Sequence, residues 1–178
     1  MILITLSFIK FNNSNHYEIV ENIFMEYMEW VIQQIELFYN TKLESNFAKN
    51  IINKTMKHLE QFYPPKGRFF LIMYDNQLAG TGCLRNNKKG IGEIKRMYIR
   101  PKMRGMGLGK KTLEKLITEA KIIGYSKLRL DTGPFMKEAQ SLYRSYGFKE
   151  IDIYPETEVP EEFRSKWSFL EKKLDIKK

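Results

Sequence analysis

The chain has very few residues that commonly bind metals or form crosslinks: one cysteine, Cys83, and two histidines, His16 and His58, among 178 residues. A single cysteine excludes an internal disulfide and a cysteine-rich metal site. The histidines lie far apart in the sequence and lack the cysteine or carboxylate spacing of a ligand set. We therefore expect no bound metal.

Long apolar runs are also missing. The apolar opening, residues 1–9, is too short to cross a bilayer, and it lacks the basic segment and small-residue cleavage site of a signal peptide. We interpret it as a first strand. Because no segment indicates export or membrane insertion, we predict a cytoplasmic protein without a membrane partner.

Acidic residues are fewer than basic ones, 21 against 30, which gives a formal net charge of +9. Such an excess suits a phosphate-bearing ligand, nucleic acid or an anionic membrane surface, and it is also compatible with a merely solvated basic surface. The lysines are scattered as pairs along the chain, whereas a nucleic-acid footprint is more concentrated. The length and the 43% apolar content predict a single domain over residues 1–178 with a substantial core.

Hydrophobic periodicity and turn residues predict alternating helices and strands. The predicted elements are a strand over 1–11, a loop over 12–15, a helix with an apolar stripe from Val20 to Phe38, a helix over 44–62, strands over 68–74 and 78–84 joined by a turn at 75–77, a turn over 86–90, a strand from Glu93, a helix from about Gly107 to Gly124, a strand over 127–131, a helix from Met136 stopped by Gly147, a short strand over 148–151 and a last strand over 163–174.

A basic, glycine-rich turn follows the strand that starts at Glu93. Gly105, Gly107 and Gly109 alternate there, and Arg104 and Lys110 flank them. Alternate glycines let the backbone approach an anion closely, and a helix starting in the turn directs its unpaired N–H groups and positive dipole end to the same place. The turn therefore predicts a diphosphate-binding site.

Two common phosphate loops do not fit this turn. A Walker loop ending in Gly109-Lys110 would need glycine at position 104 and Ser or Thr at 111, where the chain has Arg104 and Lys111. A dinucleotide fingerprint starting at Gly105 would need glycine at 110, the position of Lys110. The pattern that remains is R-x-x-G-x-G, starting at Arg104.

This pattern resembles the acyl-CoA loop of the GCN5-related N-acetyltransferases, the GNAT superfamily. A second motif of that superfamily, A-x-x-L-Y-x-x-x-G-F, extends from Ala139 to Phe148, and the two are separated by a helix and a strand of suitable length. The resemblance covers essentially the whole chain. It implies an α/β (α+β) fold in which about four helices flank a mixed, mostly antiparallel sheet that splays into a V-shaped cleft for acetyl-CoA.

The resemblance also implies which residues bind acetyl-CoA. The backbone of Met97, Tyr98 and Ile99 would pair with the pantetheine arm, and one amide, that of Met97, would donate to the acetyl carbonyl. Such a donor typically contributes on the order of 3 kcal/mol. The diphosphate would be held by the turn and the start of its helix, namely Arg104, Gly105, Met106, Gly107, Leu108, Gly109 and Lys110. Many relatives have an asparagine where this chain has Met136, so one polar contact to pantetheine is missing.

Three side chains are candidates for catalysis by the same resemblance. Tyr143 lies where the family places a tyrosine that protonates the departing thiolate, although it could also be an ordinary core residue. Glu93 or Asp131 would be the general base that deprotonates the attacking ammonium, directly or through water; Glu93 could instead be a strand carboxylate paired with a neighbouring cation. Cys83 has no obvious histidine partner, so we expect direct transfer through a tetrahedral intermediate without a covalent acyl-enzyme.

The sequence does not identify the amine that would accept the acetyl group. The acidic residues of 154–162 could face a cationic amine or lie in a solvated loop, whereas Arg96 and Arg129 could hold the carboxylate of an amino acid or a peptide end. We expect an amine-bearing small molecule or peptide as the partner, and a homodimer is possible by analogy. A non-catalytic acyl-CoA-binding regulator and a basic nucleic-acid-binding module are the alternatives.

Overall fold

Seven strands form one sheet in the order β1-β2-β3-β4-β5-β7-β6 in the computed structural model, which describes residues 5–11 and 13–175. The elements are β1 (Leu6–Lys10), α1 (Asn13–Tyr39), α2 (Phe47–Lys57), η1 (Leu59–Phe62), β2 (Arg68–Tyr74), β3 (Gln77–Lys88), β4 (Ile91–Ile99), η2 (Pro101–Met103), α3 (Leu108–Ile123), β5 (Lys127–Thr132), α4 (Lys137–Ser145), β6 (Lys149–Glu150), η3 (Glu161–Lys166) and β7 (Ser168–Lys173). The η elements are 3₁₀ helices. The mixed α/β fold predicted from the sequence is confirmed.

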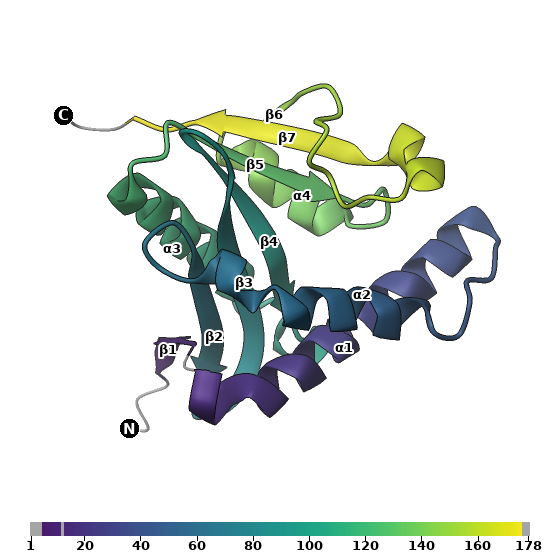
Figure 1. The fold of residues 1–178 in the computed structure, drawn as a ribbon, viewed down its shortest axis with the longest axis horizontal. Coiled ribbons are helices and arrows are strands. Elements are labelled where there is room, and N and C mark those ends of the chain that lie inside the picture. Colours follow the sequence, from purple (N-terminus) through teal and green to yellow (C-terminus); the bar gives the residue numbers. More distant parts are fainter. Residues whose placement is uncertain (1–4, 12, 176–178) are drawn as a thin grey trace.

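One pair of neighbouring strands is parallel, β4 with β5, and all the others are antiparallel. The parallel pairing covers only Ile91–Glu93 against Lys127–Arg129. Beyond Glu93 the two strands diverge, while β5 remains paired with β7 along its whole length (Figure 1). We call this short parallel contact the seam. Its opening confirms the predicted V in a mostly antiparallel sheet.

Separate apolar clusters cover the two faces of the sheet. Val20, Ile23 and Phe24 of α1 are completely buried in one cluster, which also contains residues of α2. Leu113 and Leu116 of α3 are completely buried in the other. Spacings of three and four residues place these side chains on one side of each helix, as the periodicity predicted. Figure 1 shows α1 and α2 on one side of the sheet and α3 on the other.

Several predicted boundaries near the N-terminus need correction. Residues 1–4 and 12 lie outside the described residues, so the outer parts of the first predicted strand and loop have no counterpart here. The rest of the predicted loop, 13–15, is helical, since α1 begins at Asn13. Asn and Ser are common at helix starts as well as in loops, which explains the error. The predicted helix over 44–62 is shorter, because α2 ends at Lys57 and a separate 3₁₀ helix follows.

The later corrections concern strand ends. β3 continues to Lys88, so the turn predicted over 86–90 begins only after it. The strand predicted over 148–151 contains two residues, Lys149 and Glu150. The last strand begins at Ser168, and Phe163 lies in a 3₁₀ helix that follows Pro160. Proline at a helix start is favourable, and here it outweighs the apolar pattern that suggested a strand.

None of the helices among the described residues has the length and apolar character needed to cross a membrane.

Candidate active site

The glycine-rich turn has the backbone geometry that its glycines allow. Gly105 has φ +79° and Gly107 has φ +74°, both in the left-handed region. Gly107 is the N-cap of α3, whose first residue is Leu108. A β-carbon built on Gly105 or Gly107 would meet no atom within 4 Å. The space beside these glycines is therefore open, and the first amides of α3 are available to a ligand there.

Arg104 is held beside this turn by contacts within the chain. Its guanidinium carbon lies 4.7 Å from the centre of the Trp30 ring on α1, a cation–π contact. Its Nε donates to the carbonyl oxygen of Ile99 at 3.1 Å. The positive charge is thereby fixed between the end of β4 and α1.

A cavity of about 840 Å³ lies where β4 and β5 diverge. We call it the first cavity. It is bounded by β4, β5, the glycine-rich turn, α1 and α4. Ten of the predicted site residues line it: Met97, Tyr98, Ile99, Arg104, Gly105, Gly107, Leu108, Gly109, Asp131 and Tyr143. The other three, Glu93, Met106 and Lys110, are not among its lining residues.

A β-bulge shapes the wall that β4 contributes. Thr81 pairs with Tyr98 and Cys83 with Lys95, so Gly82 stands opposite two residues, Arg96 and Met97. Arg96 has φ +52°, which is uncommon for a residue other than glycine. The Thr81 hydroxyl donates to the Arg96 carbonyl at 2.7 Å and supports this conformation. No local sequence signal indicated the bulge.

Tyr143 on α4 points its hydroxyl towards the bulged strand. The side chain is buried, and its hydroxyl lies 3.8 Å from the sulfur of Met97. Burial raises the pKa of Tyr143, and the neighbouring Tyr27 and Asp131 raise it further. The phenol therefore stays protonated at neutral pH. Tyr146, in contrast, donates to Glu114 at 2.6 Å and does not line the first cavity.

Glu93 is completely buried within a group of polar side chains. Arg85 donates from Nε to Glu93 Oε2 at 2.7 Å, and the Tyr154 hydroxyl donates to Oε1 at 2.8 Å. Asn87 also donates to Oε2, at 3.2 Å. Glu93 thus neutralises the charge of Arg85, and both of its carboxylate oxygens have partners within the chain.

Asp131 lies at the end of β5, beside the opening of the seam. It accepts from Lys95 Nζ at 2.9 Å and from the Trp167 indole at 3.1 Å. Burial by itself would lower the pKa of Lys95, but the nearby carboxylates of Asp131, Glu93 and Glu158 more than offset this and raise it. Lys95 therefore remains a cation and orients Asp131.

A second cavity, of about 750 Å³, lies between α1, α2, β4 and the segment 155–160. We call it the second cavity. It shares part of its wall with the first, namely Tyr27, Lys95, Arg96, Asp131 and Met136. Tyr27 stacks on Tyr98 with ring centres 4.9 Å apart. The sequence placed Tyr27 only in the apolar stripe of a helix, and nothing in that pattern separates it from core residues.

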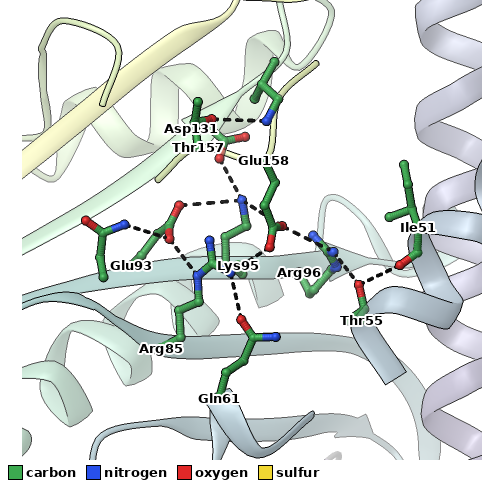
Figure 2. A network of polar contacts seen from close by, with 12 residues as sticks. Ile51, Thr55, Gln61, Arg85, Glu93, Lys95, Arg96, Asp131, Thr157 and Glu158 are labelled. Atoms are coloured by element: carbon green, nitrogen blue, oxygen red, sulfur yellow. Dashed lines mark hydrogen bonds and ion pairs between the residues drawn. The ribbon is translucent and has the colours of Figure 1, made fainter. Parts of the chain in front are cut away.

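Glu158 connects the segment 155–160 to the strands (Figure 2). It is 2.7 Å from Arg85 and 3.5 Å from both Lys95 and Arg96. Burial would raise the pKa of Glu158, but the three cations lower it to about 2. Glu156 pairs with Lys88 at 2.8 Å. These two acids of the segment 154–162 therefore compensate basic residues of the chain itself.

Cys83 is buried in the sheet, and burial raises the pKa of its thiol. Such a thiol is a poor nucleophile at neutral pH. Among the described residues, no group of three or more His, Cys, Asp or Glu side chains is arranged to hold a metal ion.

Comparisons with known proteins agree with this geometry. The model of the acetyltransferase (GNAT) family matches residues 20–148. An uncharacterised N-acetyltransferase of Escherichia coli, YjgM, is 29% identical over 126 residues, which are 68% of this chain and 74% of the relative. The PaiA N-acetyltransferase from Thermoplasma acidophilum, solved with coenzyme A, has a similar fold, with a TM-score of 0.71 and 18% identity over 95% of this chain and 99% of that one. A GNAT acetyltransferase from Elizabethkingia anophelis with acetyl-CoA bound has a TM-score of 0.55 and 26% identity over 71% of this chain and 83% of that one.

Proposed function

Because this chain belongs to the acetyltransferase (GNAT) family, we propose that it transfers the acetyl group of acetyl-CoA to a primary amine by direct attack. As a member of the family it is an acetyl-CoA-dependent N-acetyltransferase. The observation that carries the direct route is the first cavity, where the glycine-rich turn, the bulged strand β4, Tyr143 and Asp131 line one space.

The residues present fit acetyl-CoA. The open space beside Gly105 and Gly107 suits a diphosphate, which the first amides of α3, Arg104 and Lys110 would bind. An extended pantetheine arm would lie along Met97–Ile99, where β4 no longer pairs with β5. The thioester would then reach Tyr143, whose hydroxyl is close to Met97.

Asp131 is the better placed of the two candidate bases. It lines both cavities, whereas Glu93 lines neither and is occupied by Arg85, Tyr154 and Asn87. An alkylammonium with a pKa near 10 must lose a proton before it can attack. In our proposal Asp131 accepts that proton. Glu93 has a structural role instead, because its ion pair with Arg85 joins β4 to β3.

The transfer then balances without a covalent enzyme intermediate. The amine nitrogen forms a bond to the acetyl carbon, the carbon–sulfur bond breaks, and Tyr143 gives its proton to the departing thiolate. The nitrogen, which is cationic after the attack, loses its second proton to solvent as the amide forms, and a proton from solvent restores Tyr143. The Met97 amide, beside the bulge, is our candidate for stabilising the oxyanion. Buried Cys83 offers no competing thiolate route.

Incubation with acetyl-CoA and a panel of amines, with a thiol reagent to detect free CoA, tests this function. We expect CoA release that depends on both the amine and the enzyme, and the acetylated amine should appear in equal amount. If acetyl-CoA binds but no amine releases CoA, the chain is a non-catalytic acyl-CoA-binding protein instead.

A further inference from the structure

The second cavity indicates what kind of amine the site accepts. Resting on the function proposed above, we infer that the acceptor is a free amino acid, with its carboxylate bound by Arg96 and its amine beside Asp131. Arg96 would then determine specificity.

Arg96 is a largely buried cation with unused hydrogen-bonding capacity. Its side chain is 10% exposed, and it lines both cavities. Nη2 donates to the hydroxyl of Thr55 at 2.8 Å and lies 3.5 Å from Glu158. Nε is buried and has no hydrogen-bond partner among the described residues. A buried N–H without a partner is unfavourable, and a carboxylate that accepted from it would remove this cost.

The backbone at Arg96 adds a second argument. The left-handed φ of +52° and the bulge direct this side chain from β4 towards α2 and the segment 155–160. Strained conformations of this kind persist where the surrounding structure holds them, and they are concentrated at functional sites. Here Thr81 stabilises the conformation through its hydrogen bond to the Arg96 carbonyl.

The charges around the second cavity favour an anionic group. Three of its carboxylates form ion pairs: Asp131 with Lys95, Glu156 with Lys88, and Glu158 with Arg85. Glu156 is paired through Oε1 alone, and its Oε2 is buried without a hydrogen-bond partner among the described residues. A fourth, Glu60, is largely exposed and pairs with His58. Two lining cations, Lys54 and Arg164, form no ion pair among the described residues; Arg164 Nε donates to a backbone carbonyl instead.

Glu158 does not neutralise Arg96 by itself. Its shorter contact, 2.7 Å, is to Arg85, and its 3.5 Å separation from Arg96 is shared with an equal one from Lys95. A guanidinium carries five donors in a planar fork that matches a carboxylate. The described partners leave Nε and part of this fork for a ligand.

The two ends of an amino acid suit the two parts of this wall. Asp131, Lys95, Glu158 and Arg96 follow one another in a single chain of ion pairs (Figure 2). The amine at Asp131 would thus lie beside the first cavity, with the carboxylate on Arg96 in the second. A polyamine would instead place a cation next to Lys95 and Arg96, which is electrostatically unfavourable.

Matched substrate pairs test the inference. Each of five amino acids is compared with its α-carboxamide, which keeps the amine but loses the charge of the α-carboxylate: glycine, alanine, leucine, phenylalanine and aspartate. Spermidine serves as a polyamine without a carboxylate. We expect at least one amino acid to exceed its amide in kcat/KM by about tenfold or more.

The Arg96→Asn variant should abolish that preference, since asparagine tolerates a left-handed φ but carries no charge. Its KM for the amino acid should rise about tenfold or more, while the KM for acetyl-CoA changes little. Arg96→Lys should keep part of the preference, because it keeps the charge without the fork. The control is Lys121→Gln, which removes one positive charge from an exposed position on α3 and should behave like the wild type.

Equal use of amino acids and amides, faster use of spermidine, or a preference that survives in Arg96→Asn would overturn the inference while CoA release still supported the proposed function. If Arg96→Asn fails to fold, the test rests on the substrate pairs measured with the wild type and on the reduced preference expected for Arg96→Lys.

If acetyl-CoA binds but nothing releases CoA, the proposed function fails. Calorimetry of the same amino acids on CoA-saturated protein then tests the carboxylate site by itself: no binding overturns that site, and binding lost in Arg96→Asn supports it as a ligand site.

Discussion

Tyr143 is the candidate catalytic residue whose position fits its proposed role most closely. Its hydroxyl lies by Met97 in the first cavity, and its raised pKa keeps it protonated. We expect Tyr143→Phe to lower kcat by about 100-fold or more, the usual scale for a lost general acid. Steady-state assays of CoA release give kcat, and calorimetry with CoA should show nearly unchanged affinity.

The matched control for that variant is Tyr146→Phe. This substitution also removes one phenolic hydroxyl from the end of the same helix, but the hydroxyl bonds Glu114 outside the first cavity. Its kcat should stay within a few-fold of the wild type. Equal losses in both variants would mean that Tyr143 acts only through the packing of α4.

The two carboxylates should separate catalysis from stability. Asp131→Asn is expected to lower kcat about 100-fold, the typical effect of losing a general base. Glu93→Gln is expected to lower the free energy of unfolding by roughly 3 kcal/mol, because it removes the fully buried one of the two charge partners of the largely buried Arg85 and leaves only Glu158. Rate assays and urea unfolding of both variants measure these effects. A stable Glu93→Gln enzyme without activity, beside an active Asp131→Asn enzyme, would reverse the assignment.

The residues predicted from contiguous motifs are the ones that lie around one cavity, and their roles stay predictions. The glycine-rich turn and Tyr143 are each set by a short local pattern, and both line the first cavity. Arg96 was noted only as one of two possible carboxylate ligands. Its left-handed backbone belongs to a bulge that lies opposite Gly82 of the neighbouring strand β3. No periodicity along one strand reveals such an arrangement.

Helix α3 allows the role of its glycines to be tested at the level of the element. Gly107 and Gly124 cap its two ends, both with left-handed φ and with open space for a β-carbon. Gly107→Ala and Gly124→Ala should therefore each destabilise the chain by about 1 to 2 kcal/mol. Only Gly107→Ala should also weaken CoA binding in calorimetry, since its methyl group would occupy the space proposed for the diphosphate. Equal CoA affinity in the two variants would contradict this placement.

The segment 155–160 should respond to acid through Glu158. Its folded pKa of about 2 lies below the ordinary value of 4.5. The ionised carboxylate thus stabilises the fold above about pH 4.5, and this contribution is lost as the pH falls towards 2. Melting curves between these pH values should show a smaller decline for Glu158→Gln than for the wild type.

The pKa values of Glu119 and Glu171 are lowered as well, and both residues are present in both proteins. The difference between the two melting series therefore isolates Glu158. Parallel declines would show that its ion pairs do not hold the segment in solution.

Among the elements, regular periodicity was a good guide and apolar content alone was not. The stripe on α3 correctly placed its ends at Gly107 and Gly124. Phe163, in contrast, is a buried core residue on a 3₁₀ helix, although its neighbourhood suggested a strand. A short buried segment satisfies the same apolar pattern in either conformation, and tertiary packing selects between them.

For the whole molecule, ligand binding should appear as thermal stabilisation. Acetyl-CoA at 100 times its dissociation constant adds about 2.7 kcal/mol. In a domain of this size that corresponds to a rise in Tm of about 5 to 11 °C. Differential scanning fluorimetry measures it, with equimolar ATP as a control for general anion binding. An equal rise with ATP, or none with acetyl-CoA, would contradict the specific site.

The arrangement of the whole sheet was predictable only through the family resemblance. The alternation of helices and strands is compatible with many topologies. Seven strands with a single parallel contact three residues long result from long-range pairings that have no local signature. The V shape follows from these pairings.

The seam also bears on how the molecule avoids self-association. A strand with unpaired main-chain groups usually invites a strand from another chain and so promotes aggregation. Here the open side of β4 lies in a cavity beside Tyr27, Trp30 and Phe135, which are bulky and pack against other aromatic rings. These rings leave room for a slender, flexible ligand but obstruct a second polypeptide. The same walls that form the binding site thus protect the exposed edge from other copies of the protein.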